Sequence, residues 1–264
     1  QNGVHTYFVI NSVFFDPDIF GRFLALVMIL FAAVLLYDRR QRDQLVTVGV
    51  LAWLWAGLVL TLSRSSLGAL LAGLAALGAM RWKARPILLA AAAVIVVGIA
   101  AVAISPKTFG LNQGLNGASS GRAGLVSGGL QLFGDRPLWG YGSGSFSKEY
   151  KRLNPTVSAN LSASHTIAVT IAAEQGLIGE LPYLALVVVA VMALFRGARR
   201  DPARAAIAAA FLALVLHTQL YADFLEDPLT WALLGIGTAL AYGARGRVAA
   251  TVTPRAEQLA TLPA

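Results

Sequence analysis

The chain has 264 residues, of which 57% are hydrophobic and only 13% are charged. Because soluble globular domains carry about 25% charged residues, this composition excludes a soluble globular protein and predicts several membrane crossings. The formal net charge of +8 would suggest nucleic acid binding in a soluble protein. The chain has no cysteine, which excludes disulfide scaffolds, thiol catalysis and cysteine-ligated metals.

Seven stretches without acidic or basic residues are candidate membrane-spanning helices. A helix needs about 20 apolar residues to cross a bilayer, and flanking arginines or lysines can supply missing length. In chain order the stretches are Phe23–Tyr37, Gln44–Ser63, Ser65–Met80, Pro86–Pro106, Leu181–Phe195, Ala205–Ala222 and Pro228–Ala244. The sequence therefore predicts an all-α polytopic membrane protein with about seven transmembrane helices and a long, partly helical outer loop.

Most basic residues lie in alternate connections between these stretches, which predicts that those connections face the cytoplasm. The expected organisation is an outer-face segment (1–20), transmembrane helices 1–4 (21–105), a long periplasmic or extracellular loop (106–164), a boundary helix (165–176), transmembrane helices 5–7 (177–244) and a disordered cytoplasmic tail (245–264). The basicity then reflects membrane orientation, and no nucleic acid partner is expected. Since Gln1 would lie outside, further spans are expected upstream.

Arg64 lies between two predicted spans, within Ser63-Arg64-Ser65-Ser66. Membrane insertion disfavours arginine in outer connections, so this position calls for an explanation. One interpretation is a snorkelling anchor at the tip of a helical hairpin. The other is a guanidinium held at the membrane boundary to bind an anion.

The outer loop contains a short amphipathic segment at 123–133, which predicts a helix capped by Ser119 or Ser120. Arg122 would lie in its first turn, where free backbone N–H groups attract anions. The alternative is a solvated surface arginine.

A glycine-rich segment follows at 137–146, and it lacks the strand and helix that a dinucleotide site requires. Its glycines predict a tight turn beneath a ligand or a neighbouring helix. The aromatic side chains of this region could stack on sugar rings, or they could form the core of an outer subdomain. They are Trp139, Tyr141, Phe146 and Tyr150.

His165 is the strongest single candidate for chemistry. The sequence predicts a helix that starts after Ser164 and ends at Gly176, with His165 in its first turn. The helix dipole there favours the neutral imidazole, which a general base requires. The alternative is an interfacial histidine whose ring nitrogens are merely satisfied. His217 lies inside the sixth predicted span, where an ionisable residue is a functional candidate. The alternative, which the sequence favours, is packing or hydrogen bonding between helices.

A metal site is not expected. The chain has only three histidines and no cysteine, and HxxxH spacing does not occur. No cofactor is expected either.

Four segments resemble the O-antigen ligase/polymerase superfamily of bacterial membrane glycosyltransferases. In order they are FFDPDIFGRFLALVMI (14–29), SRSSLGALLAGL (63–74), SGRAGLVSGGLQLFGDRPLWGYGSGSF (120–146) and ASHTIAVTIAAEQGLIG (163–179). The last two are the specific ones. The family often has His-Asn at His165-Thr166 and Asp-Pro-Asn at Asp16-Pro17-Asp18, so the resemblance indicates no particular branch.

The resemblance implies metal-independent, inverting transfer of a glycan from undecaprenyl diphosphate to an acceptor hydroxyl on the outer face of the bacterial plasma membrane. It implies that Arg64 and Arg122 bind the diphosphate and that His165 deprotonates the acceptor. The expected partners are the lipid-linked glycan donor, a glycan, lipid or protein acceptor, and the bilayer. Two alternatives stay open: a protein O-oligosaccharyltransferase of the same superfamily, and a non-catalytic transporter or scaffold of envelope polysaccharide assembly.

Overall fold

The computed structural model describes residues 10–38, 40–82, 84–104, 121–155, 164–221 and 223–243, and every regular element among them is a helix. The prediction of an all-α chain is confirmed for this part of the sequence. The start of the predicted outer segment, residues 106–120 and 156–163 of the predicted outer loop, and the predicted cytoplasmic tail lie outside the described residues.

Four helices follow a short 3-10 turn, η1 (Ser12–Phe14): α1 (Pro17–Tyr37), α2 (Gln41–Thr61), α3 (Arg64–Arg81) and α4 (Ala84–Ile104). α1 begins at Pro17 because the Asp16 carboxylate accepts hydrogen bonds from the next free N–H groups, including that of Asp18 at 2.7 Å. α3 begins where the Ser63 hydroxyl accepts from the N–H of Ser66 at 3.2 Å. Both helix starts therefore follow directly from capping residues.

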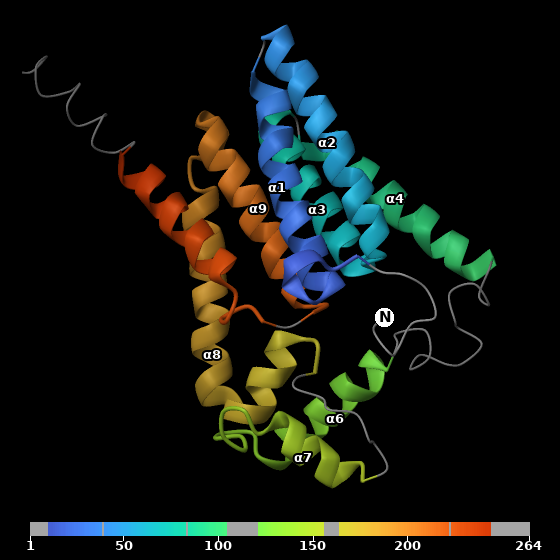
Figure 1. Cartoon of the computed structure of the whole chain (residues 1–264). Coiled ribbons are helices and arrows are strands. Elements are labelled where there is room, and N and C mark those ends of the chain that lie inside the picture. Colours follow the sequence, from blue (N-terminus) through green and yellow to red (C-terminus); the bar gives the residue numbers. More distant parts are fainter. Residues whose placement is uncertain are drawn as a thin grey trace, which may run out of the picture.

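The second part of the chain forms α6 (Arg122–Asp135), α7 (Phe146–Leu153), α8 (Ile167–Phe195), η3 (Ala198–Arg200), α9 (Pro202–Thr218) and a last helix at 228–243. α9 packs against α1, α3 and α8 (Figure 1), and its alanine-rich first half is buried. Small side chains allow this close approach of helices. α1, α3 and α9 thus form the centre of the bundle.

α8 is broken at Gly176, whose φ of 61° and ψ of −160° are not helical. A loop that starts at Pro137 lies against this break, and the N–H of Leu177 donates to the Pro137 carbonyl at 2.8 Å. A Cβ atom on Gly140 would lie 2.3 Å from the carbonyl carbon of Glu174. The glycines of this loop therefore allow two backbones to touch, as the sequence predicted for a neighbouring helix.

α6, α7 and residues 136–145 form a small unit, here called the loop subdomain, below the bundle in Figure 1. The Glu174 carboxylate caps α7 by accepting from the N–H groups of Gly144 and Phe146 at 2.8 and 3.0 Å. The core of the subdomain consists of Leu125, Leu132, Phe146, Tyr150 and Ala173. Two of the four aromatics thus belong to this core, whereas Trp139 is 74% exposed.

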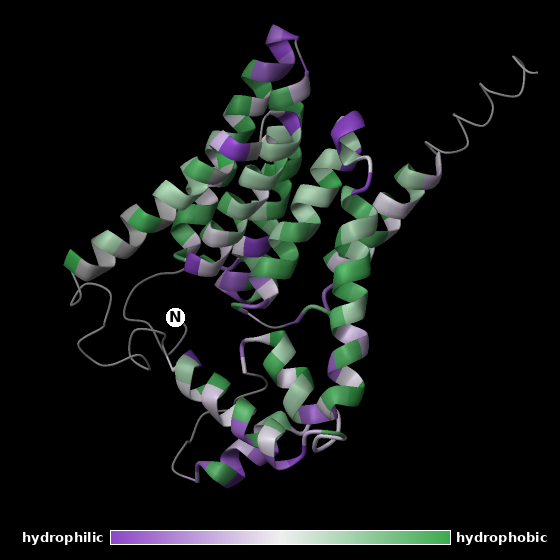
Figure 2. Ribbon diagram, turned by 180° about the vertical axis from the view of Figure 1, so that it is seen from behind, coloured by the Kyte–Doolittle hydropathy of each residue, from purple (hydrophilic) through white to green (hydrophobic). Residues whose placement is uncertain are grey.

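The helices have the composition of a membrane protein. Among the described residues, Pro17–Tyr37, Gln41–Thr61 and Ile167–Arg200 are long and apolar enough to cross a membrane, and Pro202–Thr218 is apolar but shorter. Figure 2 shows hydrophobic residues along the bundle and hydrophilic residues at the α1–α2 tip and at the end where α1 begins. Three candidate spans are fewer than the seven predicted, so the number of crossings stays a prediction.

Basic residues at the end of α3 and after α8, both in connections predicted to face the cytoplasm, meet at one end of the bundle. The Arg81 side chain donates to the carbonyl of Leu36 at 3.5 Å, and that of Arg199 to the carbonyl of Ala79 at 3.1 Å. The starts of α1 and α3 and the end of α9 lie together at the other end, which we call the Asp18 end.

Candidate functional site

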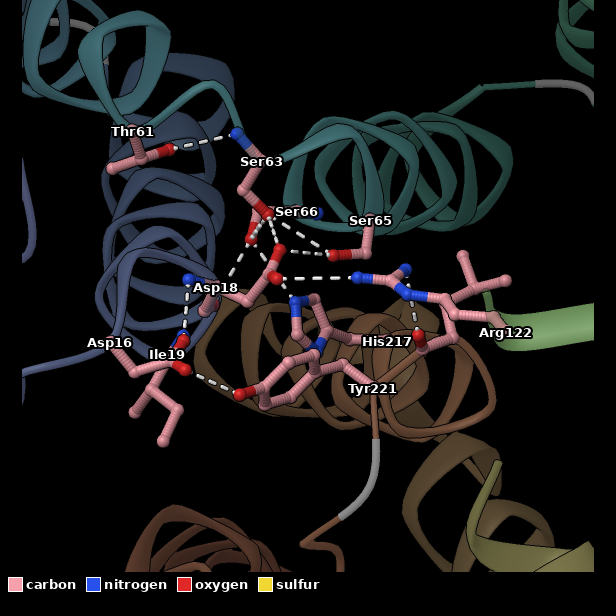
Figure 3. Close-up of polar contacts among 11 residues, drawn as sticks. Asp16, Asp18, Ile19, Thr61, Ser63, Ser65, Ser66, Arg122, His217 and Tyr221 are labelled. Carbon is pink, nitrogen blue, oxygen red and sulfur yellow. Dashed lines mark hydrogen bonds and ion pairs between the residues drawn. The ribbon is translucent and has the colours of Figure 1, made fainter. Parts of the chain in front are cut away.

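The Asp18 carboxylate lies at the centre of a polar cluster at this end of the bundle (Figure 3). The Ser63 and Ser65 hydroxyls both donate to Oδ1, the second at 2.9 Å. Oδ2 lies 3.3 Å from Nη2 of Arg122. The Ser66 hydroxyl donates to the Asp18 backbone carbonyl at 3.3 Å. One acidic residue thus connects α1, α3 and α6.

The local structure explains why a carboxylate is stable there. Asp18 is in the first turn of α1, and its serine partners open α3. Helix N-termini carry a partial positive charge that favours anions. The Asp18 side chain is 19% exposed, so its contacts with the serines and Arg122 are largely shielded from water.

Arg122 is the first residue of α6 and faces the bundle. Besides the Asp18 carboxylate, its guanidinium binds the Leu220 carbonyl through Nη1 at 3.0 Å, and it lies 5.9 Å from the centre of the Tyr221 ring. A guanidinium has five N–H groups, so these two hydrogen bonds leave three for a ligand. The side chain is 34% exposed and therefore accessible. The predicted cap at Ser119 or Ser120 is wrong, because Gly121 occupies the N-cap position.

His165 precedes α8 rather than lying in its first turn, because the helix begins at Ile167 with Thr166 as N-cap. Its φ of 61° is a left-handed conformation that is uncommon for residues with a side chain. The flanking residues hold it there: the Ser164 hydroxyl donates to the Thr166 carbonyl at 2.7 Å, and the Thr166 hydroxyl to the Gln219 carbonyl at 3.0 Å. Backbone strain of this kind concentrates at functional sites.

The His165 imidazole is half-buried, with its ring centre 5.3 Å from that of Tyr221. Burial lowers the pKa of His165, and the positive charge of Arg122 lowers it further. Three carboxylates oppose this shift of the His165 pKa: Asp16, Asp18 and Asp223. The net lowering keeps the imidazole neutral near pH 7. No described residue forms a hydrogen bond to its ring nitrogens.

Tyr221 stands between the two predicted site residues. Its ring contacts the His165 imidazole and the Arg122 guanidinium, and its hydroxyl donates to the Asp16 carboxylate. Burial raises the pKa of the Tyr221 hydroxyl, and the hydrogen bond to Asp16 raises it further. The phenol therefore stays protonated and fixes the ring as a spacer.

Arg64 is at the same end but outside these contacts. It is the first residue of α3, between the two serines that bind Asp18, yet its own side chain is exposed. No described residue pairs with it. The structure thus brings Arg122 and His165 together around Tyr221 and leaves Arg64 facing outward, which suits either an anchor or a ligand contact.

Other polar residues of this region are buried between helices. His217 is fully buried, and its Nε2 lies 3.1 Å from the Ser66 hydroxyl, which links α9 to α3 as predicted for a histidine between helices. Arg22 and Asp227 form a 2.8 Å ion pair with side chains only 2% and 5% exposed. Neither this ion pair nor the roles of Asp18 and Tyr221 were predicted from the sequence.

A comparison with known families identifies the kind of protein that carries this site. The sequence model of the O-antigen ligase family matches residues 49–184, just over half of the chain. The chain belongs to the O-antigen ligase family. A search of curated proteins finds no match.

Membership of the O-antigen ligases agrees with the apolar helices, because these enzymes are membrane glycosyltransferases of the ligase type. The matched region contains Arg64, Arg122 and His165. Asp18 and Tyr221 lie outside it and join the site only through the fold.

Proposed function

We propose that the protein transfers a glycan from undecaprenyl diphosphate to an acceptor hydroxyl at the outer face of the bacterial plasma membrane. The observation that supports this most strongly is the approach of the Arg122 guanidinium and the His165 imidazole to one ring, that of Tyr221. An anion-binding group and a neutral base are then close to each other. They lie at the Asp18 end of the apolar bundle, where a lipid-linked donor would present its head group.

Arg122 and Arg64 bind the donor diphosphate in this proposal. Guanidiniums bind phosphate oxygens through paired N–H groups, and they stabilise the charge that develops on a leaving diphosphate. Arg122 has three N–H groups beyond its contacts with Asp18 and Leu220. The exposed Arg64 reaches the donor from the start of α3. The two arginines take the place of a metal ion in neutralising the diphosphate.

His165 accepts the proton of the acceptor hydroxyl. The acceptor oxygen attacks the anomeric carbon, a new C–O bond forms, and the bond to the diphosphate breaks with its electron pair on the diphosphate oxygen. This single displacement inverts the anomeric centre. The lowered pKa of His165 keeps the imidazole neutral and able to act.

The test uses the full chain in lipid vesicles with an undecaprenyl-diphosphate glycan, a chelator, and lipid, glycan or protein acceptors in separate reactions. Released undecaprenyl diphosphate and the enlarged acceptor are measured. His165→Ala should lower turnover by about 10²- to 10⁴-fold while the donor still binds. Arg64→Ala and Arg122→Ala should raise the donor KM. Arg136→Ala is the matched control, because Arg136 stacks on Tyr141 within the loop subdomain.

Each negative outcome identifies the part of the proposal that fails. Full activity of the His165 variant removes the base, and loss of wild-type activity in chelator removes the metal-independent mechanism. Transfer to protein alone identifies a protein O-oligosaccharyltransferase. Movement of the donor across the vesicle membrane without glycan transfer favours a transporter.

A further inference from the structure

The hydrogen-bond donors around Asp18 are of the kind that binds anions, and the Asp18 carboxylate already occupies them. Its carboxylate receives two hydroxyl hydrogen bonds, from Ser63 and Ser65, and one contact from the Arg122 guanidinium (Figure 3). Two hydroxyls and a guanidinium are also groups that bind phosphate oxygens. The Asp18 carboxylate thus occupies an N–H group of Arg122 that a diphosphate bound there could also use.

The contact between Asp18 and Arg122 has the geometry of an exchangeable pair. It is a single contact at 3.3 Å, whereas strong charged hydrogen bonds measure about 2.7–2.9 Å and arginine often forms two in parallel. The Leu220 carbonyl holds the same guanidinium at 3.0 Å. Arg122 therefore keeps its place if Asp18 releases it.

The alternative partners of Asp18 also favour exchange. Oδ1 is held by the serine hydroxyls of α3, so the carboxylate stays hydrogen-bonded when Oδ2 loses the guanidinium. With Arg122 34% and Asp18 19% exposed, a ligand reaches the arginine from solvent. The carboxylate can thus lose its contact with Arg122 and keep its serine hydrogen bonds, so it does not become an unpaired buried charge.

We propose that Asp18 is a resident anion that occupies Arg122 in the donor-free enzyme and yields the guanidinium to the donor diphosphate. This inference rests on the proposed function, because it assigns the diphosphate to Arg122. Asp18 then sets the donor affinity: it competes with the incoming diphosphate, and it takes the guanidinium back from the polyprenyl diphosphate that remains after glycan transfer, which promotes product release.

The direct test measures binding of a polyprenyl diphosphate without glycan to the full chain in detergent micelles. Asp18→Asn keeps the shape of the side chain and removes its charge. Because one partly exposed charge pair is worth up to about 1 kcal/mol, removing the competing charge should lower the Kd by up to about fivefold. Asp18→Ala should tighten binding as well, which excludes a new hydrogen bond from the asparagine amide as the cause. Steady-state kinetics should show stronger product inhibition in both variants.

Glu149→Gln is the matched control, because it removes one negative charge from α7, where Glu149 pairs with Arg152 at 3.1 Å. Its Kd should equal that of the wild type. Unchanged or weaker binding in a folded Asp18→Asn protein overturns the inference, and weaker binding would show that Asp18 positions Arg122 instead. If Arg122→Ala binds as well as the wild type, the proposed diphosphate site itself fails, and this result is distinct from a failure at Asp18 alone.

Discussion

The buried ion pair between Arg22 and Asp227 offers a sharp test of what holds the Asp18 end together. Nη2 of Arg22 lies 2.8 Å from Oδ2 of Asp227. Asp227 also starts the last helix, because its Oδ1 accepts from the N–H of Leu229 at 2.8 Å. The pair therefore ties the start of the last helix to α1.

The change to make is Arg22→Met, which keeps the length of the side chain and leaves Asp227 as a buried charge. Because the two side chains are only 2% and 5% exposed, water cannot compensate, and the variant should lose about 3–5 kcal/mol of unfolding free energy. Arg22→Met with Asp227→Asn should recover about 2 kcal/mol or more, since asparagine carries no charge and caps a helix as well as aspartate.

The assay is reversible unfolding of the purified protein in mixed micelles, with each variant compared with the wild type. Arg40→Met is the control, because Arg40 lies 4.0 Å from Asp43 with its own side chain 84% exposed, and its loss should change stability by less than about 0.5 kcal/mol. The reasoning is refuted if the double variant is as unstable as Arg22→Met, or if Arg22→Met behaves like the control.

Three further predictions concern the site and its support. Activity should fall as the pH falls through the pKa of His165. Asp18→Asn removes a negative charge that raises this pKa, so it should move the acidic limb of the kcat/KM profile to lower pH. Arg122→Gln removes a positive charge that lowers this pKa, so it should move the acidic limb to higher pH. Identical pH profiles would contradict the proposed base. Arg122→Lys keeps the charge but loses the guanidinium fork, so the donor KM should rise about tenfold at constant protein stability. Gly176→Ala places a Cβ atom 2.4 Å from backbone atoms of the adjoining loop, at a φ of 61°. It should therefore lower the unfolding free energy by about 3 kcal/mol. Gly134→Ala is the control, because the space around Gly134 is open, and it should change the unfolding free energy little.

The sequence could predict the elements because their signals are local. Charge-free stretches indicate apolar helices, although α1 begins at Pro17, before the predicted stretch at Phe23, because the Asp16 side chain caps it there. Arg122 and His165 could be found because each stands beside a predicted helix start with an apolar segment after it. The helix dipole argument for His165 nevertheless failed in detail, since the residue precedes the N-cap and its pKa is lowered chiefly by burial.

The rest of the site depends on contacts between residues far apart in the chain. Asp18 meets Arg122 across 104 positions, and Tyr221 meets Asp16 across 205. The residues next to Asp18 in the sequence do not indicate which arginine its carboxylate will contact in the folded protein. Arg22 gave a signal, a charge one turn inside an apolar helix, but its partner Asp227 is set only by where the last helix begins in the folded bundle.

The same contacts that build the candidate site also attach the loop subdomain to the bundle. α6 is held at its first residue by Arg122, and α8 is held at its start by the bond from Thr166 to Gln219. His165 adjoins the second attachment and Arg122 is itself the first, so the proposed base and the proposed diphosphate-binding arginine are each fixed to the bundle by a contact of their own. Exchange at Asp18 would loosen only the Arg122 anchor. The proposed base would therefore keep its place while the donor enters, which is what a reaction with a bound acceptor requires.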